Sequence, residues 1–146
     1  MRRAIEIAKG NPDAPFGCVI VERETGGVVA EGLNDAEESP VLHGETAAVM
    51  NLFEKHPGVD TSGLVLYTTA EPCPMCAGAI LWSGIPLVVV GTGLGTIKRL
   101  GLRHVDVPCD EVSARASFGG FEVMLGVLED DCDPLYEEMA RRESGL

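Results

Sequence analysis

The sequence predicts an α/β fold, a three-layer α/β/α sandwich around a central mixed sheet of about five strands. Two apolar runs, "LVLYTT" at 64–69 and "PLVVVGT" at 86–92, are of the kind that is buried on both faces of a sheet. Helical patterns lie between and around these strands, so strand–helix–strand crossovers should cover both faces of the sheet with helices. A hairpin near the start makes the sheet mixed rather than wholly parallel.

The amino-terminal part of the chain predicts a helix, a hairpin and a second helix. Residues 2–9 form an amphipathic helix that ends at "NPDAP". β-Branched residues predict strands at 16–22 and 28–34, joined by the turn "ETGG". A helix over 44–55 follows the loop "SPVLHGE". Its expected packing face consists of residues that recur at helical spacing: Thr46, Ala47, Met50 and Phe53.

The carboxy-terminal half predicts two more helices and an edge strand. A short helix runs from Pro74 to about Ser83, and 121–128 forms the edge strand. The final helix covers 133–143, with acidic residues in its first turn and two arginines near its end, as the helix dipole favours. Residues 93–120 are rich in glycine and predict no definite element.

Length and hydropathy predict one domain, residues 1–146, in the cytoplasm. A chain of 146 residues is long enough to bury a core of its own and has the usual size of a single domain. No apolar run approaches the roughly 20 residues of a membrane-spanning helix. The start, "MRRAIEIAKG", returns to polar residues too soon for a secretion signal. We therefore expect no membrane association.

The charge balance argues against a nucleic-acid partner. Lys and Arg number 11 against 23 Asp and Glu, for a net charge of −12. Such a surface repels the phosphate backbones that nucleic-acid-binding proteins neutralise. The stretch "IKRLGLRH" at 97–104 is the one candidate for a basic patch, and an ordinary solvated turn explains it better.

Five cysteines, an odd number, argue against a disulfide framework and favour metal or catalytic use. Three of them have no partner at ligand spacing and are expected to be ordinary small residues: Cys18, Cys109 and Cys132. Cys73 and Cys76 are spaced Cys-x-x-Cys, about one helical turn apart. At a helix N-terminus, unpaired N–H groups and the dipole favour the thiolate form that a metal requires. A thioredoxin-like redox pair and two unremarkable cysteines remain alternatives at this point.

His43 favours the metal site over those alternatives. His43 lies in a loop that follows a strand, just before the helix 44–55, and Cys73 lies in the loop that follows the strand 64–69. Loops beyond the carboxyl ends of strands converge on a shared crevice, so the two residues should lie close together. One imidazole and two thiolates leave a tetrahedral Zn²⁺ with one open position, which is the pattern of a catalytic zinc site. His56 and His104 stand apart from any ligand spacing.

Glu45 lies two residues past His43, in the first turn of the same helix. It is either an acid that complements the helix dipole or a carboxylate that moves protons beside an open zinc. Zinc lowers the pKa of a bound water towards about 7, and a nearby carboxylate can take up and return the proton. The residues themselves leave both roles open.

Two motifs, "LHGE" at 42–45 and "AEPCPMCAGAI" at 70–80, resemble the His-x-Glu and Pro-Cys-x-x-Cys signature of the cytidine deaminase-like superfamily. The resemblance covers nearly the whole chain, with mixed features. His-Gly-Glu, "LYTT" and "GIPLVVVG" are similar to fungal-type cytosine deaminases, whereas "PFGCVIV", "EPCPMC" and Trp82 look like guanine deaminases. The ending "GVLEDDCDPLYEEMARR" resembles that of tRNA adenosine deaminases. No single subfamily matches throughout.

The resemblance implies a single CMP/dCMP-type deaminase domain with a cytidine deaminase-like sandwich. It implies a Zn²⁺ ion bound by His43, Cys73 and Cys76. It further implies that Glu45 carries protons between the attacking water, the substrate ring and the departing amine.

The resemblance also implies contacts with the substrate. Asn34 matches a family asparagine that hydrogen-bonds the substrate ring, and the backbone N–H of Gly44 is a second donor to a ring carbonyl. Phe16 and Trp82 are expected either to stack on a base or to lie in the core. Family C-terminal segments often cover the pocket, which makes Tyr136 and the acids of "EDDCD" candidates for that cover.

We therefore expect a zinc-dependent hydrolytic deaminase of a small free nucleobase or nucleoside, of the cytosine or guanine type. The alternative is a tRNA adenosine-to-inosine deaminase, which the C-terminal helix favours and the acidic charge disfavours. A non-catalytic zinc-binding domain and a redox Cys-x-x-Cys protein are weaker alternatives. The resemblance implies a homodimer or higher homo-oligomer, with the apolar helix "CAGAILWSG" as a candidate surface.

Overall fold

The structure of this chain, a computed structural model, describes residues 1–145. Within that range the chain forms five strands and six helices. The strands are β1 (Gly17–Glu22), β2 (Val28–Leu33), β3 (Leu64–Ala70), β4 (Leu87–Thr92) and β5 (Glu122–Met124). The helices are α1 (Arg2–Ala8), α2 (Gly44–Lys55), α3 (Pro74–Ser83), α4 (Leu94–Arg99), α5 (Cys109–Ala114) and α6 (Glu129–Glu143).

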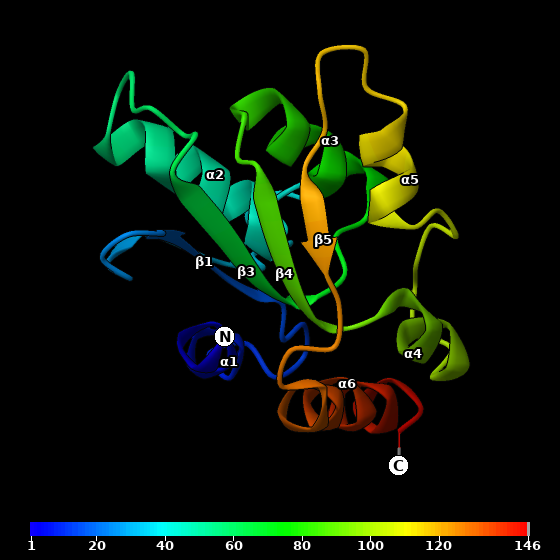
Figure 1. The fold of residues 1–146 in the computed structure, drawn as a ribbon. Coiled ribbons are helices and arrows are strands. Elements are labelled where there is room, and N and C mark those ends of the chain that lie inside the picture. Colours follow the sequence, from blue (N-terminus) through cyan, green and yellow to red (C-terminus); the bar gives the residue numbers. More distant parts are fainter. Residues whose placement is uncertain (146) are drawn as a thin grey trace.

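The strands form one mixed sheet in the order β2-β1-β3-β4-β5, and helices cover both of its faces (Figure 1). β1 pairs antiparallel with β2 and β3, whereas β3, β4 and β5 run parallel. α2, α3 and α5 lie on one face of the sheet, and α1 and α6 lie on the other. This arrangement confirms the predicted three-layer α/β/α sandwich with a mixed sheet.

The parallel strands place the starts of several helices at one edge of the sheet. β3 leads through α3 back to β4, and β4 leads through α4 and α5 to β5. Parallel neighbours require such crossovers, and the loops beyond their carboxyl ends meet at the same edge. The loop after β3, which begins at residue 71, therefore lies close to the loop after β4, which begins at residue 93.

Two apolar clusters hold the layers together. The larger cluster lies between the sheet and the layer of α2, α3 and α5, and its fully buried members include Ile20, Leu52, Leu66, Ile80 and Val90. Burying one such side chain stabilises the fold by about 1.5–3 kcal/mol. The smaller cluster joins α4 and α6 to the end of β3 through Ala70, Ile97, Leu102 and Tyr136.

The predicted packing face of α2 is wrong. The residues that face the sheet are Glu45, Ala48 and Leu52, whereas Met50 is 63% exposed and Phe53 is exposed on the outer side. Helical spacing alone predicts the stripe of Thr46, Ala47, Met50 and Phe53, and acidic side chains such as Glu45 are rarely buried, so nothing in the spacing points to the observed stripe. Backbone packing selects the observed stripe, since β2 approaches α2 so closely that a Cβ on Gly32 would collide with the backbone at Ala48.

The glycine-rich residues 93–120 contain α4 and α5, which the sequence did not predict. One side chain, Glu71, connects both helices to the end of β3. Its Oε2 accepts a hydrogen bond from the Leu94 N–H at 2.7 Å, and its Oε1 accepts one from the Cys109 N–H at 3.1 Å. The first N–H groups of a helix lack intrahelical partners, so this one carboxylate satisfies the starts of two helices. Such a long-range cap leaves no signal at local spacing.

The last strand and helix differ from the prediction in their bounds. β5 is the predicted edge strand, but it is shorter than 121–128. α6 begins at Glu129 rather than at the predicted residue 133, because acidic residues, which the helix dipole favours in a first turn, extend it before Pro134. The two arginines of its last turn are placed as predicted. Within residues 1–145, no helix combines the length and apolar character that crossing a bilayer requires.

Candidate active site

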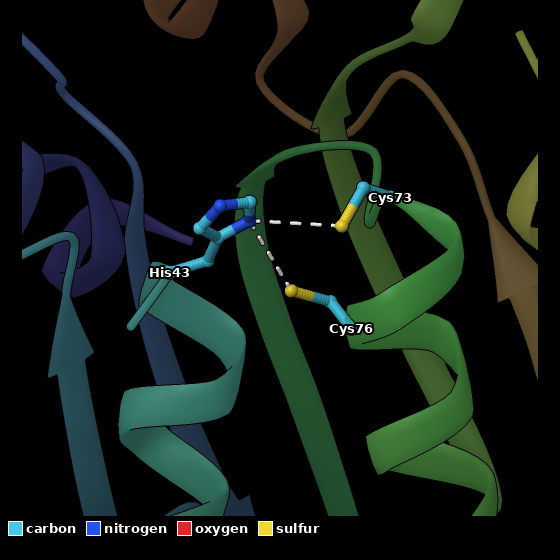
Figure 2. A group of neighbouring side chains, drawn as sticks. All are labelled: His43, Cys73 and Cys76. Carbon is cyan, nitrogen blue, oxygen red and sulfur yellow. Dashed lines mark hydrogen bonds between the residues drawn. The ribbon is translucent and has the colours of Figure 1, made fainter. Parts of the chain in front are cut away.

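Two helix starts face each other and bring the three predicted metal ligands together (Figure 2). His43 is the N-cap of α2, Cys73 is the N-cap of α3, and Cys76 lies in the first turn of α3. Pro74 occupies the first position of α3, where the N–H it lacks would have no helical partner. The Thr46 hydroxyl accepts a hydrogen bond from the backbone N–H of His43 at 2.9 Å and so fixes the start of α2.

The ligand atoms have the spacing of a tetrahedral zinc site. Nδ1 of His43 lies 3.6 Å from Sγ of Cys73 and 3.6 Å from Sγ of Cys76. Zn–N bonds of about 2.0–2.1 Å and Zn–S bonds of about 2.3 Å, at a tetrahedral angle, separate N and S by about 3.6 Å. Within residues 1–145, no fourth Cys, His, Asp or Glu joins this group. The three residues therefore fit a Zn²⁺ ion and leave it one open position.

The surroundings of the two thiols favour ionisation of one of them, Cys73. A hydrogen bond from Cys76 lowers the pKa of Cys73 to about 4, and His43 acts in the same direction. That hydrogen bond and burial raise the pKa of Cys76. The pair thus carries one negative charge before a metal arrives, and a bound divalent cation ionises the second thiol.

Glu45 is a buried carboxylate beside this cluster. It is 3% exposed, and burial raises its pKa even though it accepts a hydrogen bond from Thr68. The Cys76 thiol is close enough that Glu45 raises the pKa of Cys76. An acid that served only the helix dipole would gain nothing from burial. A carboxylate in such a place can both take up and release a proton.

Thr68 is a site residue that the sequence argument missed. Its Oγ1 lies 2.7 Å from Oε1 of Glu45 and 2.9 Å from the carbonyl oxygen of Ala70. A hydroxyl has one proton, so Thr68 donates to one of these acceptors at a time. The signal in the sequence is the pair of adjacent threonines in "LVLYTT", because neighbours on a strand face opposite sides of the sheet.

Asn34 and Gly44 both contact the carbonyl group of Phe16. The backbone N–H of Asn34 donates to that carbonyl oxygen at 3.1 Å, and a Cβ on Gly44 would lie 2.5 Å from the same oxygen. Glycine in the His-Gly-Glu motif thus lets the segment before β1 approach α2 closely. The side-chain Oδ1 of Asn34 accepts a hydrogen bond from the Ala36 N–H at 3.1 Å, which leaves its Nδ2 hydrogens to donate elsewhere.

Trp82 fits neither expectation, whereas Phe16 packs against the smaller apolar cluster, as the core alternative expects. Trp82 is 80% exposed and packs on Phe118, with 4.6 Å between ring centroids. It follows Cys76 by six residues, about 9 Å along the helix axis, so it lies neither in the core nor at the cluster. Phe16 packs on Tyr136 with 5.1 Å between centroids. Tyr136 is fully buried behind the sheet rather than covering a pocket.

The other cysteines are ordinary buried residues, as predicted. Cys18, Cys109 and Cys132 are buried and free. Among residues 1–145, none of them joins a group of potential metal ligands. His104 also lies outside the group of potential metal ligands, and its Nδ1 lies 2.8 Å from the carbonyl oxygen of Leu102.

Comparisons with known proteins support the same site. Residues 1–92 match the family described as the cytidine and deoxycytidylate deaminase zinc-binding region. A probable cytosine deaminase of Schizosaccharomyces pombe is 30% identical over 138 residues, which span 90% of this chain and 84% of that protein. A tRNA-specific adenosine deaminase of Haemophilus influenzae is 31% identical over 137 residues, which span 90% and 76%. The structure of a guanine deaminase from Nitrosomonas europaea superposes with a TM-score of 0.80 at 25% identity and covers 95% and 81%.

These relatives share deamination in their names and differ in the base. The matched region contains His43, Cys73 and Cys76, the residues whose spacing fits zinc. The mixed features of the sequence correspond to similarity with several kinds of deaminase rather than one. This chain belongs to the cytidine and deoxycytidylate deaminase family of zinc-dependent nucleobase and nucleoside deaminases.

Proposed function

We propose that this protein hydrolytically removes the amino group of a small free nucleobase or nucleoside of the cytosine or guanine type, leaving a carbonyl and releasing ammonia. The observation that carries the proposal is the burial of Glu45 beside the three-ligand cluster. A zinc-binding scaffold needs the ligands but not a carboxylate buried next to them, and burying an acid costs stability. His43, Cys73 and Cys76 would hold a Zn²⁺ ion, which as a Lewis acid would lower the pKa of water towards about 7.

Glu45 moves the protons of this reaction. It accepts a proton from the attacking water and passes it to the ring nitrogen beside the amino-bearing carbon. It then accepts the remaining proton from the hydroxyl added to that carbon and delivers it to the amino group, which leaves as ammonia while the carbonyl forms. When ionised, it accepts the Thr68 hydroxyl proton at 2.7 Å. When protonated, it donates to Thr68 Oγ1, and Thr68 turns its own proton to the Ala70 carbonyl at 2.9 Å. Both states of the carboxylate are therefore satisfied in a buried place.

Asn34 and Gly44 are the groups that we assign to substrate recognition. The side-chain oxygen of Asn34 is engaged by Ala36, so its amide offers hydrogens. Gly44 is the first residue of α2, where a backbone N–H has no intrahelical partner. Two donors suit a ring edge that carries a carbonyl oxygen. Cytosine and guanine have such an oxygen and adenine has none, which favours the first two.

Deamination of adenosine in tRNA is the second candidate. The relative of that name in Haemophilus influenzae aligns with 90% of this chain. The net charge of −12 opposes it, because a tRNA enzyme needs cationic groups to neutralise phosphates. Filter binding to tRNA at rising salt concentration separates the candidates. Binding that weakens steeply with salt, together with ammonia release only from tRNA, would favour the second.

The deciding experiment is a screen for ammonia release by the zinc-loaded protein. The compounds are cytosine, guanine, adenine, their nucleosides and triazine analogues, with Glu45→Gln as the inactive comparison. We expect release from a cytosine-type or guanine-type compound by the wild type alone. Stoichiometric zinc without release from any compound or from tRNA would indicate a non-catalytic zinc-binding domain. Absence of zinc with a reversible Cys73–Cys76 disulfide would indicate a redox protein.

We also propose that the protein self-associates through the outer sides of α2 and α3. These helices contact each other, and their exposed apolar side chains include Met50, Met75 and Trp82. Large exposed apolar side chains on neighbouring helices are candidates for burial in an interface. Light scattering should give a mass of at least two chains, and Trp82→Glu should lower it. A monomeric wild type would overturn this proposal.

A further inference from the structure

On the face of the sheet opposite α2 and α3, a ring of three hydrogen bonds holds residues 15–17. The Gly17 N–H donates to Oγ1 of Thr69 at 3.0 Å, Oγ1 of Thr69 lies 2.7 Å from the Tyr136 hydroxyl, and that hydroxyl donates to the Pro15 carbonyl at 3.0 Å. When the Tyr136 hydroxyl donates to the Pro15 carbonyl, Thr69 donates to Tyr136, and each hydroxyl donates once and accepts once. Oγ1 of Thr69 also lies 3.3 Å from the Gly17 carbonyl oxygen and 3.4 Å from that of Pro15. The backbone from Pro15 to Gly17 closes the ring.

The ring is closed to water. Thr69 and Tyr136 are both 0% exposed, and they belong to segments far apart in the sequence, β3 and α6. A buried donor or acceptor that loses its partner costs about 1–3 kcal/mol, because no water replaces the partner. The three hydrogen bonds therefore hold the segment 15–17 in one position.

The residue enclosed by the ring contacts the groups that we assign to the substrate. The Phe16 carbonyl accepts the backbone N–H of Asn34 and lies against Gly44. The Phe16 side chain packs on the ring of Tyr136. A shift of Phe16 would therefore change the spacing between Asn34 and Gly44. Neither hydroxyl of the ring bonds to His43, Cys73 or Cys76, so we expect these three ligands to stay together when the ring is broken.

We propose that Tyr136 is a positioning residue for substrate binding. From the C-terminal helix it fixes Phe16 through the ring of hydrogen bonds, and Phe16 sets the spacing of Asn34 and Gly44. The inference rests on the proposed function for the roles of those two residues. In this proposal α6 does not cover the pocket. It holds residues 15–17, which contact Asn34 and Gly44, the two groups that we assign to substrate binding.

The test compares variants in the zinc-loaded protein. Tyr136→Phe removes the hydroxyl and keeps the aromatic packing, Thr69→Val breaks the ring at its centre, and Thr69→Ser keeps the hydroxyl. Tyr67→Phe is the matched control, because Tyr67 lies on the same face of β3, two residues before Thr69, and its hydroxyl has no hydrogen bond within residues 1–145. Thr69→Val also strips the Gly17 N–H of its acceptor, so its effect should exceed that of Tyr136→Phe.

We expect Tyr136→Phe to raise KM about tenfold with kcat within about twofold, since loss of binding geometry acts on KM. Thr69→Ser and Tyr67→Phe should stay near the wild-type KM, and all variants should keep their zinc. An unchanged KM in Tyr136→Phe and Thr69→Val, with only thermal stability lowered, would show a merely structural role and overturn the proposal. A KM increase of the same size in Tyr67→Phe would overturn it too.

A wild type that deaminates no compound would defeat the proposed function without deciding the role of Tyr136. Amide hydrogen exchange of the zinc-loaded protein decides it in that case. The amides of Gly17 and Asn34 should exchange about tenfold faster in Tyr136→Phe than in Tyr67→Phe, because both amides are held by the ring or by Phe16. Equal exchange in the two variants would overturn the proposal.

Discussion

Thr68 and Thr69 are neighbours on β3, yet they serve opposite faces of the sheet. Thr68 points towards α2 and lies 2.7 Å from Glu45, whereas Thr69 points towards α6 and lies 2.7 Å from Tyr136. Both are buried and both have a second oxygen within reach. The difference lies in the partner: a carboxylate that gains and loses a proton in the proposed reaction, or a phenol that keeps its own. The face of Thr68 can thus satisfy both protonation states of Glu45, whereas on the face of Thr69 the Tyr136 hydroxyl keeps its proton.

The largest expected effect comes from removing a metal ligand on the Thr68 face. Cys76→Ser should abolish zinc binding and deamination together. A metal at a free concentration of 1,000 times its Kd adds about 4 kcal/mol to the free energy of unfolding. Loss of zinc binding should therefore lower the free energy of unfolding by several kcal/mol. Zinc per chain and denaturant unfolding, each with and without added zinc, measure this. Cys132→Ser, at a buried free cysteine of α6, should keep its zinc; full zinc in Cys76→Ser would contradict the assigned site.

The next effect in size tests whether Glu45 moves protons. Glu45→Gln keeps the shape of the side chain and should lower kcat by about 10²–10⁴-fold, the usual contribution of general acid–base catalysis. Zinc content should remain unchanged. Glu54→Gln, at an exposed position of the same helix, is the control and should match the wild type. Turnover near the wild-type rate in Glu45→Gln would remove the proposed function.

Thr68→Val sharpens the comparison between the two threonines. It removes a hydrogen bond to a charged group, so kcat should fall about tenfold or more, while Thr68→Ser should recover most of the loss. Thr69→Val, by contrast, should act on KM. Steady-state kinetics of the three variants on one substrate measure the split. If both valine variants changed the same parameter, the division of work between the two faces would fail.

The metal ligands and Glu45 were predictable because their signals are local. Cys-x-x-Cys at a helix start and His-x-Glu at another are visible at fixed spacing, and the structure brings the three predicted ligand atoms close enough together for a zinc ion. The contact between Thr69 and Tyr136 joins residues 67 positions apart, which no periodicity reveals. The face of α2 was wrongly predicted for a related reason: helical spacing allows more than one stripe, and only the approach of β2 at Gly32 selects the one that contains Glu45, Ala48 and Leu52.

The fold class followed from continuous apolar strands, whereas α4 and α5 depended on a single distant side chain. Two helices of six residues have little stability of their own, and helices that short rely on tertiary contacts. Glu71 supplies such a contact to both of them. Glycines in that stretch point to turns but not to the carboxylate that organises them.

The smallest effect on activity is expected at Glu71, where β3 ends and neither face is involved. In Glu71→Gln only one of the two N–H groups can still find an oxygen acceptor, and the other faces the NH₂ group of the new amide. The free energy of unfolding should therefore fall by about 1–3 kcal/mol. Denaturant unfolding measures the loss, with Glu54→Gln as the control. Zinc content should stay at one per chain, because the Glu71 hydrogen bonds lead to Leu94 and Cys109 and not to the ligands. Loss of zinc in this variant would mean that α4 and α5 also help to hold the metal site. The catalytic groups could then no longer be assigned to one face of β3 and the positioning groups to the other.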